Sequence, residues 1–539
     1  MAIYNIAAAL DESAQKNPYQ VAIYFPVGRD KDDRAEYAAL SFKQLSELSD
    51  QYAHGFADYG IQKGERTLVM IRPSIDFIAV TFALLKIGAV PILIDPGMGR
   101  KEFLQCVTET EPVNLIGIPL AHILRFFVRK PFARVKTEVT VGKRLFWGGK
   151  ELRELESAKK EKFPVVETLE NDEAAVAFTS GSTGIPKGVV YRQGNFKAQV
   201  DLLQNAIGIQ AGDIDLPGLY IFALFNPALG VTTVMPDMDA TNPAKLNPAY
   251  LVEAIETFGV THSVGSPTIW KIVGKYCEEK NLTLNSMQKI LMMGAPVPPS
   301  LIGRYEKIMP EGEVFTPFGA TEAMPLTLIS GKEILGEIAD LSDKGAGMCV
   351  GRVLPGIELR VIRQSEDPIA KWADAEELPQ GEIGEIVVKG AVVTREYLHR
   401  PEQTAHAKIK EGNQIWHRMG DVGYFDKSGR LWFCGRKAHI VEMDTETLYP
   451  VQVEALFNQI AGVHRTALVA KEKKAVLVVE MQKDVGDFTK EDIIEKAWAI
   501  VEENSLSESI SEILFLTDFP VDLRHNAKIK REVIAEMVR

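Results

Sequence analysis

Helix-type and strand-type segments alternate along the N-terminal part of the chain, and this alternation restricts the fold more than any other feature. A helical pattern follows a predicted capping box at Ser41 and Gln44, and a second one covers residues 75–88. Short apolar runs typical of buried strands lie at 66–71, 89–95, 114–118, 138–141, 174–180 and 188–192. Such alternation produces α/β layers around a largely parallel sheet. We therefore predict an α/β fold.

The pattern changes after about residue 351. Residues 357–362, 381–390 and 430–435 are short β patterns separated by Gly, Pro and Asp. They predict a more antiparallel, barrel-like section. A small α+β segment follows. We predict two domains, residues 1–436 and residues 437–539.

Composition excludes several classes of protein. The chain has 539 residues, 46% of them hydrophobic and 25% charged, which is ordinary for a globular protein and argues against a mostly disordered chain. The formal net charge of −12 makes general binding to a nucleic-acid backbone a poor hypothesis.

Cysteine usage and hydropathy favour a reducing, cytoplasmic setting. The four cysteines are far apart, with no C-x-x-C pair, so neither a disulfide scaffold nor a Cys-rich zinc site is expected. The N-terminus lacks the basic region of a signal peptide. The most apolar window, residues 75–94, contains Asp76, Lys86 and Pro91, so a buried helix followed by a strand explains it better than a membrane span.

One stretch is locally basic, residues 122–136 (HILRFFVRKPFARVK). A solvated helix beside a strand is one interpretation. A weak membrane-surface or partner-enzyme association is the other. The sequence leaves the oligomeric state open.

The strongest local signal is the string TSGSTGIPKG, residues 179–188, which directly follows an apolar strand. Small residues let backbone N–H groups approach phosphate oxygens, hydroxyls add donors, and Lys187 adds a positive charge. This is not a Walker A loop, because Lys187 precedes Gly188 rather than Ser or Thr. The string predicts a polyphosphate-binding loop, with a flexible turn as the alternative.

This loop resembles the phosphate-loop signature of the adenylate-forming superfamily, which comprises acyl-CoA synthetases, peptide-synthetase adenylation domains and luciferases. Other segments resemble further motifs of that superfamily in the expected order. They are LLKIGAVPILIDP (84–96), GAP (294–296), FGATE (318–322), VGRVLPG (350–356), GEIGEIVVKG (381–390), HRMGDVGYFDKSGRLWFCGRK (417–437) and PVDLRHNAKIKR (520–531). The resemblance covers essentially the whole chain and implies ATP and Mg²⁺ as cofactors.

The resemblance also implies a role for each matching residue. The β- and γ-phosphates and the leaving pyrophosphate would be held by Thr179, Ser180, Gly181, Ser182, Thr183, Gly184 and Lys187. Glu322 would bind Mg²⁺, a hard cation that prefers carboxylate oxygen, and Thr321 would contact the α-phosphate. Lys528 would bridge the substrate carboxylate and the α-phosphate in the transition state.

The nucleoside would be held by a second group of residues: Phe318 and Gly319 with Gly294, Ala295 and Pro296 at adenine, Asp421 at the ribose hydroxyls, and Arg436 near the domain junction. Without these motifs around them, Asp421 would be a turn residue, Lys528 a solvated lysine and Phe318 a core ring. Because Asp421 and Lys528 are on opposite sides of the predicted junction, the C-terminal domain is expected to be a mobile lid.

Several departures from the superfamily pattern narrow the activity. Ala438 stands where the hinge commonly has Asp or Lys, and residues 439–454 lack the usual Gly. Asn526 and Ala527 precede Lys528 where Ser-Gly is common, and residues 222–230 (FALFNPALG) lack the expected aromatic-His pair. These departures put a standard CoA-thioester half-reaction in doubt.

One branch, the β-lactone synthetases of bacterial olefin biosynthesis, is similar at these positions and at residues 116–125 and 236–244. The resemblance implies adenylation of a 2-alkyl-3-hydroxy fatty acid, then attack of its own hydroxyl on the acyl carbon to give a β-lactone, AMP and pyrophosphate. It also implies an apolar acyl tunnel. His525 is either a base for the hydroxyl or a structural histidine. A fatty acyl-CoA synthetase or acyl-AMP ligase, and an inactive nucleotide-binding scaffold, remain as alternatives.

Overall fold

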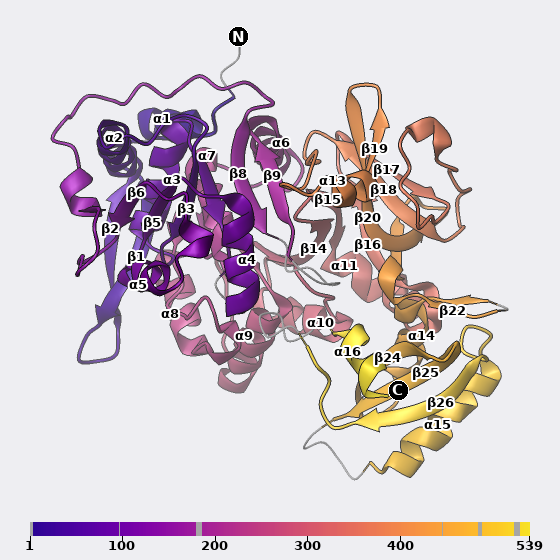
Figure 1. Ribbon diagram of the computed structural model, residues 1–539. Helices are drawn as coiled ribbons and strands as arrows, with labels where there is room; N and C mark the ends of the chain where they lie inside the picture. Colours follow the sequence, from indigo (N-terminus) through magenta and orange to yellow (C-terminus); the bar gives the residue numbers. More distant parts are fainter. Residues whose placement is uncertain are drawn as a thin grey trace.

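The computed structural model describes residues 4–95, 98–178, 186–444, 446–482, 488–521 and 529–538. Within these ranges the strands form a 7-stranded sheet, a 14-stranded sheet and two small sheets of three and two strands. The first two sheets belong to the part of the chain before residue 437 (Figure 1). The mixed α/β class predicted from the sequence is confirmed.

The 7-stranded sheet contains the predicted parallel layer. Its strands, in spatial order, are β7 (Lys150–Glu151), β6 (Thr137–Thr140), β5 (Asn114–Gly117), β3 (Arg66–Met70), β4 (Val90–Leu93), β8 (Glu173–Phe178) and β9 (Gly188–Arg192). All neighbours are parallel except β8 and β9. The predicted phosphate loop therefore joins an antiparallel pair, and its residues 179–185 lie outside the described ranges.

The 14-stranded sheet combines a parallel and an antiparallel half. Its path runs through β17 (Ile357–Ile362), β18 (Gly384–Gly390), β20 (Gln414–Phe425), β21 (Leu431–Arg436), β16 (Met348–Val353), β15 (Ala323–Ser330), β14 (Glu313–Ala320), β13 (Lys289–Met292), β12 (His262–Gly265), β10 (Ile214–Asp215), β11 (Thr232–Val234), β1 (Val21–Arg29) and β2 (Ala35–Ser41), with β19 (Lys408–Glu411) beside β20. The strands after residue 351 are antiparallel, as predicted, and among the described residues their order stays open rather than closing into a barrel.

Helices flank these two sheets. They are α1 (Ala7–Lys16), α2 (Phe42–Asp58), α3 (Ile75–Lys86), α4 (Arg100–Thr110), α5 (Pro119–Phe127), α6 (Gln193–Asn205), α7 (Asn226–Leu229), α8 (Pro248–Phe258), α9 (Pro267–Lys280), α10 (Pro299–Ile308), α11 (Gly331–Glu333), α12 (Ala339–Leu341) and α13 (Pro401–Ala407). The capping box at the start of α2 is confirmed: Gln44 N donates to Ser41 Oγ at 3.2 Å, and Ser41 N donates to Gln44 Oε1 at 2.8 Å. These two bonds satisfy backbone donors that a helix start leaves without partners.

Helix α3 is the apolar window of the sequence, and it is a core helix. Its lysine, Lys86, is fully buried and forms ion pairs with Asp11, at 2.9 Å, and with Asp50. Burial of a charge is tolerated when it is paired in this way. No helix in the described ranges is long and apolar enough to cross a membrane.

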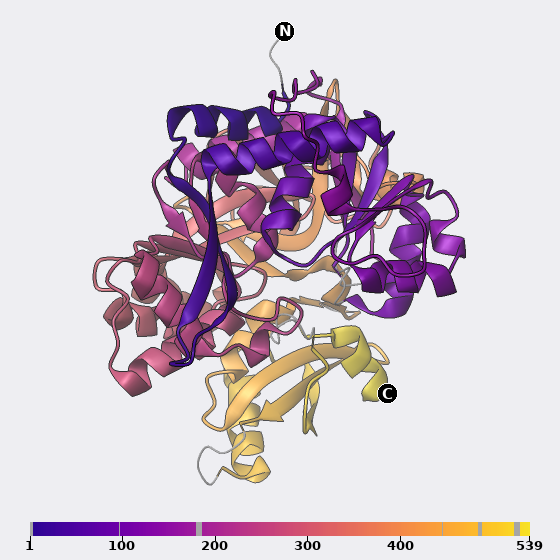
Figure 2. The ribbon, with the colours of Figure 1, turned by 90° about the vertical axis from the view of Figure 1, so that its left-hand side faces the viewer.

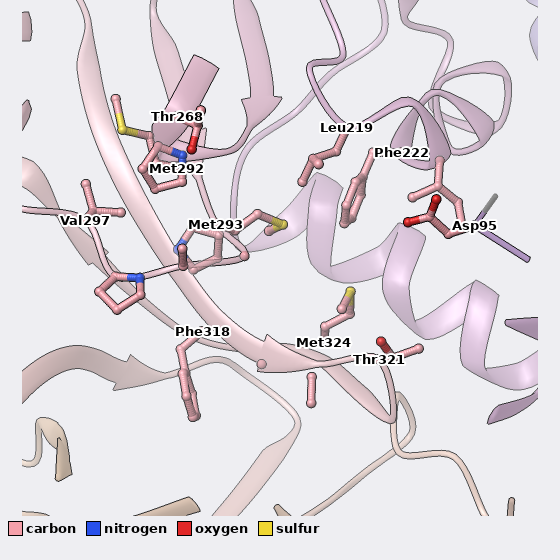
Figure 3. Close-up of a pocket in the computed structure, with 18 of the residues that line it drawn as sticks. Asp95, Leu219, Phe222, Thr268, Met292, Met293, Val297, Phe318, Thr321 and Met324 are labelled. Carbon is pink, nitrogen blue, oxygen red and sulfur yellow. The ribbon is translucent and has the colours of Figure 1, made fainter. Parts of the chain in front are cut away.

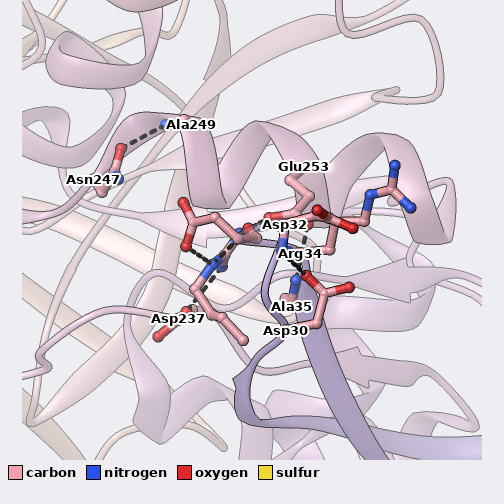
Figure 4. A network of polar contacts seen from close by, with 10 residues as sticks. Asp30, Asp32, Arg34, Ala35, Asp237, Asn247, Ala249 and Glu253 are labelled. Atoms are coloured by element: carbon pink, nitrogen blue, oxygen red, sulfur yellow. Dashed lines mark hydrogen bonds and ion pairs between the residues drawn. The ribbon is translucent and has the colours of Figure 1, made fainter.

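The tip of the β1–β2 hairpin is fastened to α8 by a polar network (Figure 4). Arg29 pairs with Asp33 at 2.8 Å, with Asp237 at 3.2 Å and with Glu253, and Ala35 N donates to Glu253 Oε1 at 3.0 Å. The neighbouring acids raise the pKa of Arg29 against the effect of desolvation. The network holds the segment that begins at residue 236, and this segment lies on the wall of a cleft.

The C-terminal part has its own sheet and core. It contains β22 (Val441–Glu442), β23 (Thr447–Leu448), α14 (Pro450–Phe457), β24 (Val463–Lys471), β25 (Lys474–Met481), α15 (Lys490–Glu503), β26 (Ile510–Leu516) and α16 (Arg531–Met537). A cluster of buried residues from Val441 to Ile510 packs these elements together except α16, whose Ile534 belongs to a second cluster with residues of β24 and β25. Figures 1 and 2 both place them, in gold and yellow, at the lower end of the molecule.

Candidate functional site

A large cleft of about 3770 Å³ lies between the two large sheets and the C-terminal elements. The GAP and FGATE segments line it, and so do Lys187, Asp421 and Arg436. The structure therefore brings together, in one cavity, every predicted site residue that it describes. These are Lys187, Gly294, Ala295, Pro296, Phe318, Gly319, Thr321, Glu322, Asp421 and Arg436.

The remaining predicted residues, Thr179 to Gly184 and Lys528, lie outside the described ranges, and so does the candidate base His525. Their immediate neighbours are described. Lys187, which follows the phosphate loop, and Ile529, which follows Lys528, both line the same cleft.

Glu322 is held in place by a cluster of buried polar side chains. The Tyr397 hydroxyl donates to Glu322 Oε1 at 2.6 Å, and Thr394 donates to the Glu322 carbonyl from its backbone N at 2.9 Å and from its Oγ1 at 3.1 Å. Burial, together with the Glu322 carboxylate, raises the pKa of Tyr397, so the phenol stays protonated and donates. The carboxylate is therefore fixed in one orientation before any ligand binds.

Two buried basic side chains, Lys408 and His417, lie behind the Glu322 carboxylate. Lys408 Nζ donates to the Thr394 carbonyl at 2.5 Å, and burial lowers the pKa of Lys408 to about 7, against the opposing effect of Glu322. Burial, with Lys408 nearby, holds the pKa of His417 well below its usual range, so this imidazole is neutral. The Lys187 ammonium lies 5.0 Å from the centre of the Tyr397 ring, a cation–π contact.

Asp421 and Arg436 face each other across the β20–β21 pair. They occupy opposite positions in the strand register, and Arg436 NH1 lies 3.0 Å from Asp421 Oδ1. Asp421 is buried, whereas Arg436 is partly exposed to the cleft. The same strand pair thus supplies Asp421, which is predicted to contact the ribose, and Arg436, which is predicted to lie near the domain junction.

The segments predicted to contact adenine have the close packing that small residues permit. Gly294 has a φ of +90°, which a side chain would disfavour, and a Cβ at Gly319 would lie 2.7 Å from the Ala323 carbonyl oxygen. The Phe318 ring lies 6.1 Å from that of Phe433 and also lines the cleft. It therefore has both core contacts and an accessible face.

The opposite side of the cleft is apolar. In Figure 3, Leu219, Phe222, Met293 and Met324 gather around the space beyond Thr321. Phe222 belongs to the 3₁₀ helix η4 (Tyr220–Leu224), within the FALF segment that replaces the expected aromatic-His pair. Residues 236–241 also line the cleft, as do Ile118 and several residues of α5. Two of the segments that resemble the β-lactone synthetase branch therefore contribute to this wall.

The sequence analysis missed Tyr191, Tyr397, Lys408 and His417. The Tyr191 hydroxyl donates to the Thr321 carbonyl from 130 positions earlier in the chain. His417 opens the motif at 417–437, but nothing there assigns it a role, and the other three belong to ordinary strand patterns or follow them without a local signal. Only the pairing of distant strands places them behind the FGATE segment.

The described residues contain no group of three or more His, Cys, Asp or Glu that could hold a metal ion by itself. One carboxylate is nevertheless compatible with Mg²⁺, which commonly takes one or two carboxylates together with substrate phosphates and water. Glu322, accessible from the cleft and fixed by Tyr397, has the required chemistry.

The family model described as "AMP-binding enzyme" matches residues 10–398. The chain belongs to the AMP-binding enzyme family. This confirms the predicted superfamily and the enzyme class, an adenylate-forming ligase.

Two curated relatives of this AMP-binding enzyme are olefin β-lactone synthetases. The chain is 44% identical to that of Stenotrophomonas maltophilia and 42% identical to that of Xanthomonas campestris pv. campestris, in each case over 98% of this chain and 97% of the relative. The predicted resemblance to this branch is thus confirmed. The solved structure of ATP-bound MatB from Rhodopseudomonas palustris has the same fold, with a TM-score of 0.78, 18% identity and 99% of each chain covered.

Proposed function

We propose that this enzyme uses ATP to activate a 2-alkyl-3-hydroxy fatty acid as an acyl-adenylate and then closes the acyl group to a β-lactone. The observation that carries the proposal is the identity of 44% and 42% to olefin β-lactone synthetases along essentially the whole chain. A polar wall for a nucleotide and an apolar wall for aliphatic chains, in one cleft, support the same reaction.

In the first step, a carboxylate oxygen of the substrate attacks the α-phosphorus of ATP. The bond from that phosphorus to the bridging oxygen breaks, and pyrophosphate leaves with the electron pair. Substrate carboxylate and phosphates are all anionic, so fixed cations and N–H donors must screen them. Thr179 to Gly184 and Lys187 would hold the β- and γ-phosphates, and Thr321 would contact the α-phosphate.

Glu322 would hold Mg²⁺, which when bound neutralises charge on the phosphates. The hydrogen bond from Tyr397 supports this role, because it occupies one carboxylate oxygen and orients the group toward the cleft wall. Asp421, which lies 3.0 Å from the Arg436 guanidinium, would accept the ribose hydroxyls. Adenine would lie against Phe318 beside Gly294 to Pro296 and Gly319.

In the second step, the 3-hydroxyl oxygen attacks the acyl carbon, the hydroxyl proton is released, and AMP leaves with the electrons of the acyl–oxygen bond. Nucleophile and electrophile belong to one molecule, so ring closure costs little translational entropy. The apolar wall around Leu219, Phe222 and Met293 would hold both aliphatic chains and keep water from the acyl-adenylate.

Residues 437–539 would act as a mobile lid that carries Lys528 to the reacting carboxylate. Lys437 is anchored to the large N-terminal part through Glu366, at 2.8 Å, and Glu385, at 3.8 Å. On the other side, Arg531 Nε donates to Glu454 Oε1 at 3.0 Å, which ties the chain just after Lys528 to α14. The first anchor would hold the start of the lid to the N-terminal part, and the second would hold the segment after Lys528 to the lid. The lid could then rotate as a unit.

The dependence of the product on CoA tests the proposal. The purified enzyme is given a racemic 2-alkyl-3-hydroxy fatty acid and ATP, with and without CoA, and products are separated by chromatography and mass spectrometry. We expect β-lactone, AMP and pyrophosphate without CoA. Formation of a thioester that requires CoA would establish an acyl-CoA synthetase instead. Absence of pyrophosphate release with every acid tested would favour an inactive nucleotide-binding scaffold.

A further inference from the structure

An exposed patch of aromatic, aliphatic and basic side chains lies at the edge of the cleft. Its apolar members are on α5 and on the loop that precedes β7: Leu120, Phe126, Phe127, Leu145 and Phe146. Phe127 is 74% exposed and Phe146 is 65% exposed. We call these five residues the apolar patch. Clustered exposed rings of this kind mark an interaction surface more often than scattered ones do.

The apolar patch is built on a rigid support. The rings of Phe126 and Phe146 meet edge to face with centroids 5.2 Å apart, which joins α5 to the loop. The next residue, Trp147, donates to Thr140 Oγ1 at 2.9 Å and stacks on His122 at 5.4 Å. The exposed rings are therefore held outward by buried neighbours.

Basic side chains are concentrated in the stretch of sequence that carries the apolar patch. Residues 119–150 contain eight Lys and Arg but one acid, Glu138, in a chain whose net charge is −12. Glu138 is engaged by Arg125 at 2.7 Å. Arg129, Lys130, Lys136 and Lys143 are exposed, and the Arg129 guanidinium lies 5.8 Å from the Phe126 ring centre. Rings interleaved with cations suit the interface of an anionic bilayer, where rings enter the headgroup region and cations meet lipid phosphates.

The same helix continues into the cleft. Leu120 and Phe127 are exposed and also line the cleft, together with Ala121, Ile123 and Leu124. One face of α5 thus connects the apolar patch with the wall of the cleft. A long-chain lipid could pass along this face without full exposure to water.

We propose that the apolar patch and its basic rim dock this enzyme on the surface of an anionic lipid bilayer, with the cleft facing the membrane. Docking requires neither ATP nor the hydroxy acid. It can therefore be tested separately from the proposed reaction, and failure of one leaves the other standing.

Vesicle flotation with the full chain tests the docking. Phosphatidylcholine vesicles with and without phosphatidylglycerol are mixed with the enzyme in the absence of nucleotide. We expect binding to the anionic vesicles, weak binding to the neutral ones, and loss of binding as salt is raised. No flotation with anionic vesicles would overturn the proposal.

Two double variants with matched controls locate the surface. Phe127→Ser with Phe146→Ser should weaken binding at least about tenfold, whereas Tyr19→Ser with Leu169→Ser, at other exposed apolar positions, should leave it unchanged. Lys130→Gln with Lys143→Gln should weaken binding about 25-fold on anionic vesicles, whereas Lys16→Gln with Lys197→Gln, at exposed positions that do not line the cleft, should not. Equal effects of variants and controls would overturn the proposal.

Folding and self-association are measured on the same samples. Each variant is compared with the unmodified enzyme by circular dichroism melting, and the lysine pair, which is fully on the surface, decides the test if the aromatic pair unfolds. Sedimentation velocity without lipid asks whether the apolar patch is a contact between copies of the chain. The unmodified enzyme could prove to be a dimer that does not bind vesicles, while the aromatic variant is a monomer. That result would show that the apolar patch contacts a second copy of the chain and not a membrane.

Discussion

The two walls of the cleft differ in how their side chains are held. On the polar wall, Glu322 and Asp421 each have a short contact to a fixed partner, Tyr397 and Arg436. On the apolar wall, Leu219, Phe222 and Met293 are held only by packing, and methionine adapts readily to different shapes. Groups that are proposed to bind the metal ion and the ribose are thus fixed in advance, whereas groups that would meet aliphatic chains can adjust. We expect changes on the polar wall to affect rate and changes on the apolar wall to affect selectivity.

The largest effect should come from Lys528, the lysine proposed to bridge the substrate carboxylate and the α-phosphate. Lys528→Ala should lower pyrophosphate release at least about a thousandfold, because a fixed cation is lost from the transition state, while ATP binding largely survives. Stopped assays of pyrophosphate and equilibrium binding of ATP measure the two quantities. Lys530→Ala, an exposed lysine two positions later, is the control and should behave as the unmodified enzyme. Near-normal pyrophosphate release by the Lys528 variant would remove this residue from the mechanism.

Glu322→Gln should lower kcat/KM for ATP about a hundredfold and raise the Mg²⁺ concentration needed for half-maximal rate, since a neutral amide is a poorer ligand. Tyr397→Phe keeps the carboxylate but removes the hydrogen bond that orients it, so a smaller loss, about tenfold, is expected. Rates measured across a Mg²⁺ titration compare the two. An unchanged Mg²⁺ dependence in Glu322→Gln would place the cation elsewhere.

On the apolar wall, Phe222→Ala should change selectivity more than rate. Removal of the ring enlarges the space for the acyl chains, so the ratio of kcat/KM for long and short acids should rise about tenfold, with little change in KM for ATP. Competition between two acids of different length measures this ratio. Phe163→Ala, at a core residue that does not itself line the cleft, should lower stability but leave the ratio unchanged. A large rise in KM for ATP in Phe222→Ala would contradict the division of labour between the walls.

The sequence was most informative where the signal is local. The strand at 66–71 and the helix at 75–88 were predictable from hydrophobic pattern, since each pattern has one period over its whole length. The FGATE and GDVGYFD segments could be predicted to share a site only through resemblance, because nothing in their spacing brings Glu322 near Asp421. The antiparallel path from β14 to β20 does so.

The buried support of the polar wall could not be predicted. In strand β19, Lys408 and Lys410 are one pleat apart and identical in type, yet Lys408 is buried behind Glu322 and Lys410 is exposed. A buried lysine contradicts the usual preference of its residue type, and the fold accommodates it by placing the Thr394 carbonyl within hydrogen-bond distance of Lys408 Nζ. The sequence likewise left the basic stretch at 122–136 open between two interpretations, because exposure of its rings depends on how α5 lies against β6.

The smallest effect concerns the stability of this support. The pKa of Lys408 is about 7 in the folded chain and 10.5 for an ordinary lysine. Between pH 7 and pH 10.5, Lys408 is therefore protonated in the unfolded chain but mostly neutral in the folded chain. Stability contributed by Lys408 is therefore full above pH 10.5 and falls as the pH drops toward 7. Lys408→Met has no such titration.

The free energy of unfolding of the unmodified enzyme, minus that of Lys408→Met, should thus rise from about pH 7.5 to about pH 9.5, by at most about 1.4 kcal/mol per pH unit. Urea unfolding without nucleotide or metal measures this difference. Lys410→Met, at an exposed position two residues further along the same strand, is the matched control and should not reproduce this rise. If the difference in unfolding free energy for Lys408→Met does not change with pH either, the lysine is charged in the folded state. The polar wall then carries a buried cation instead of a neutral donor.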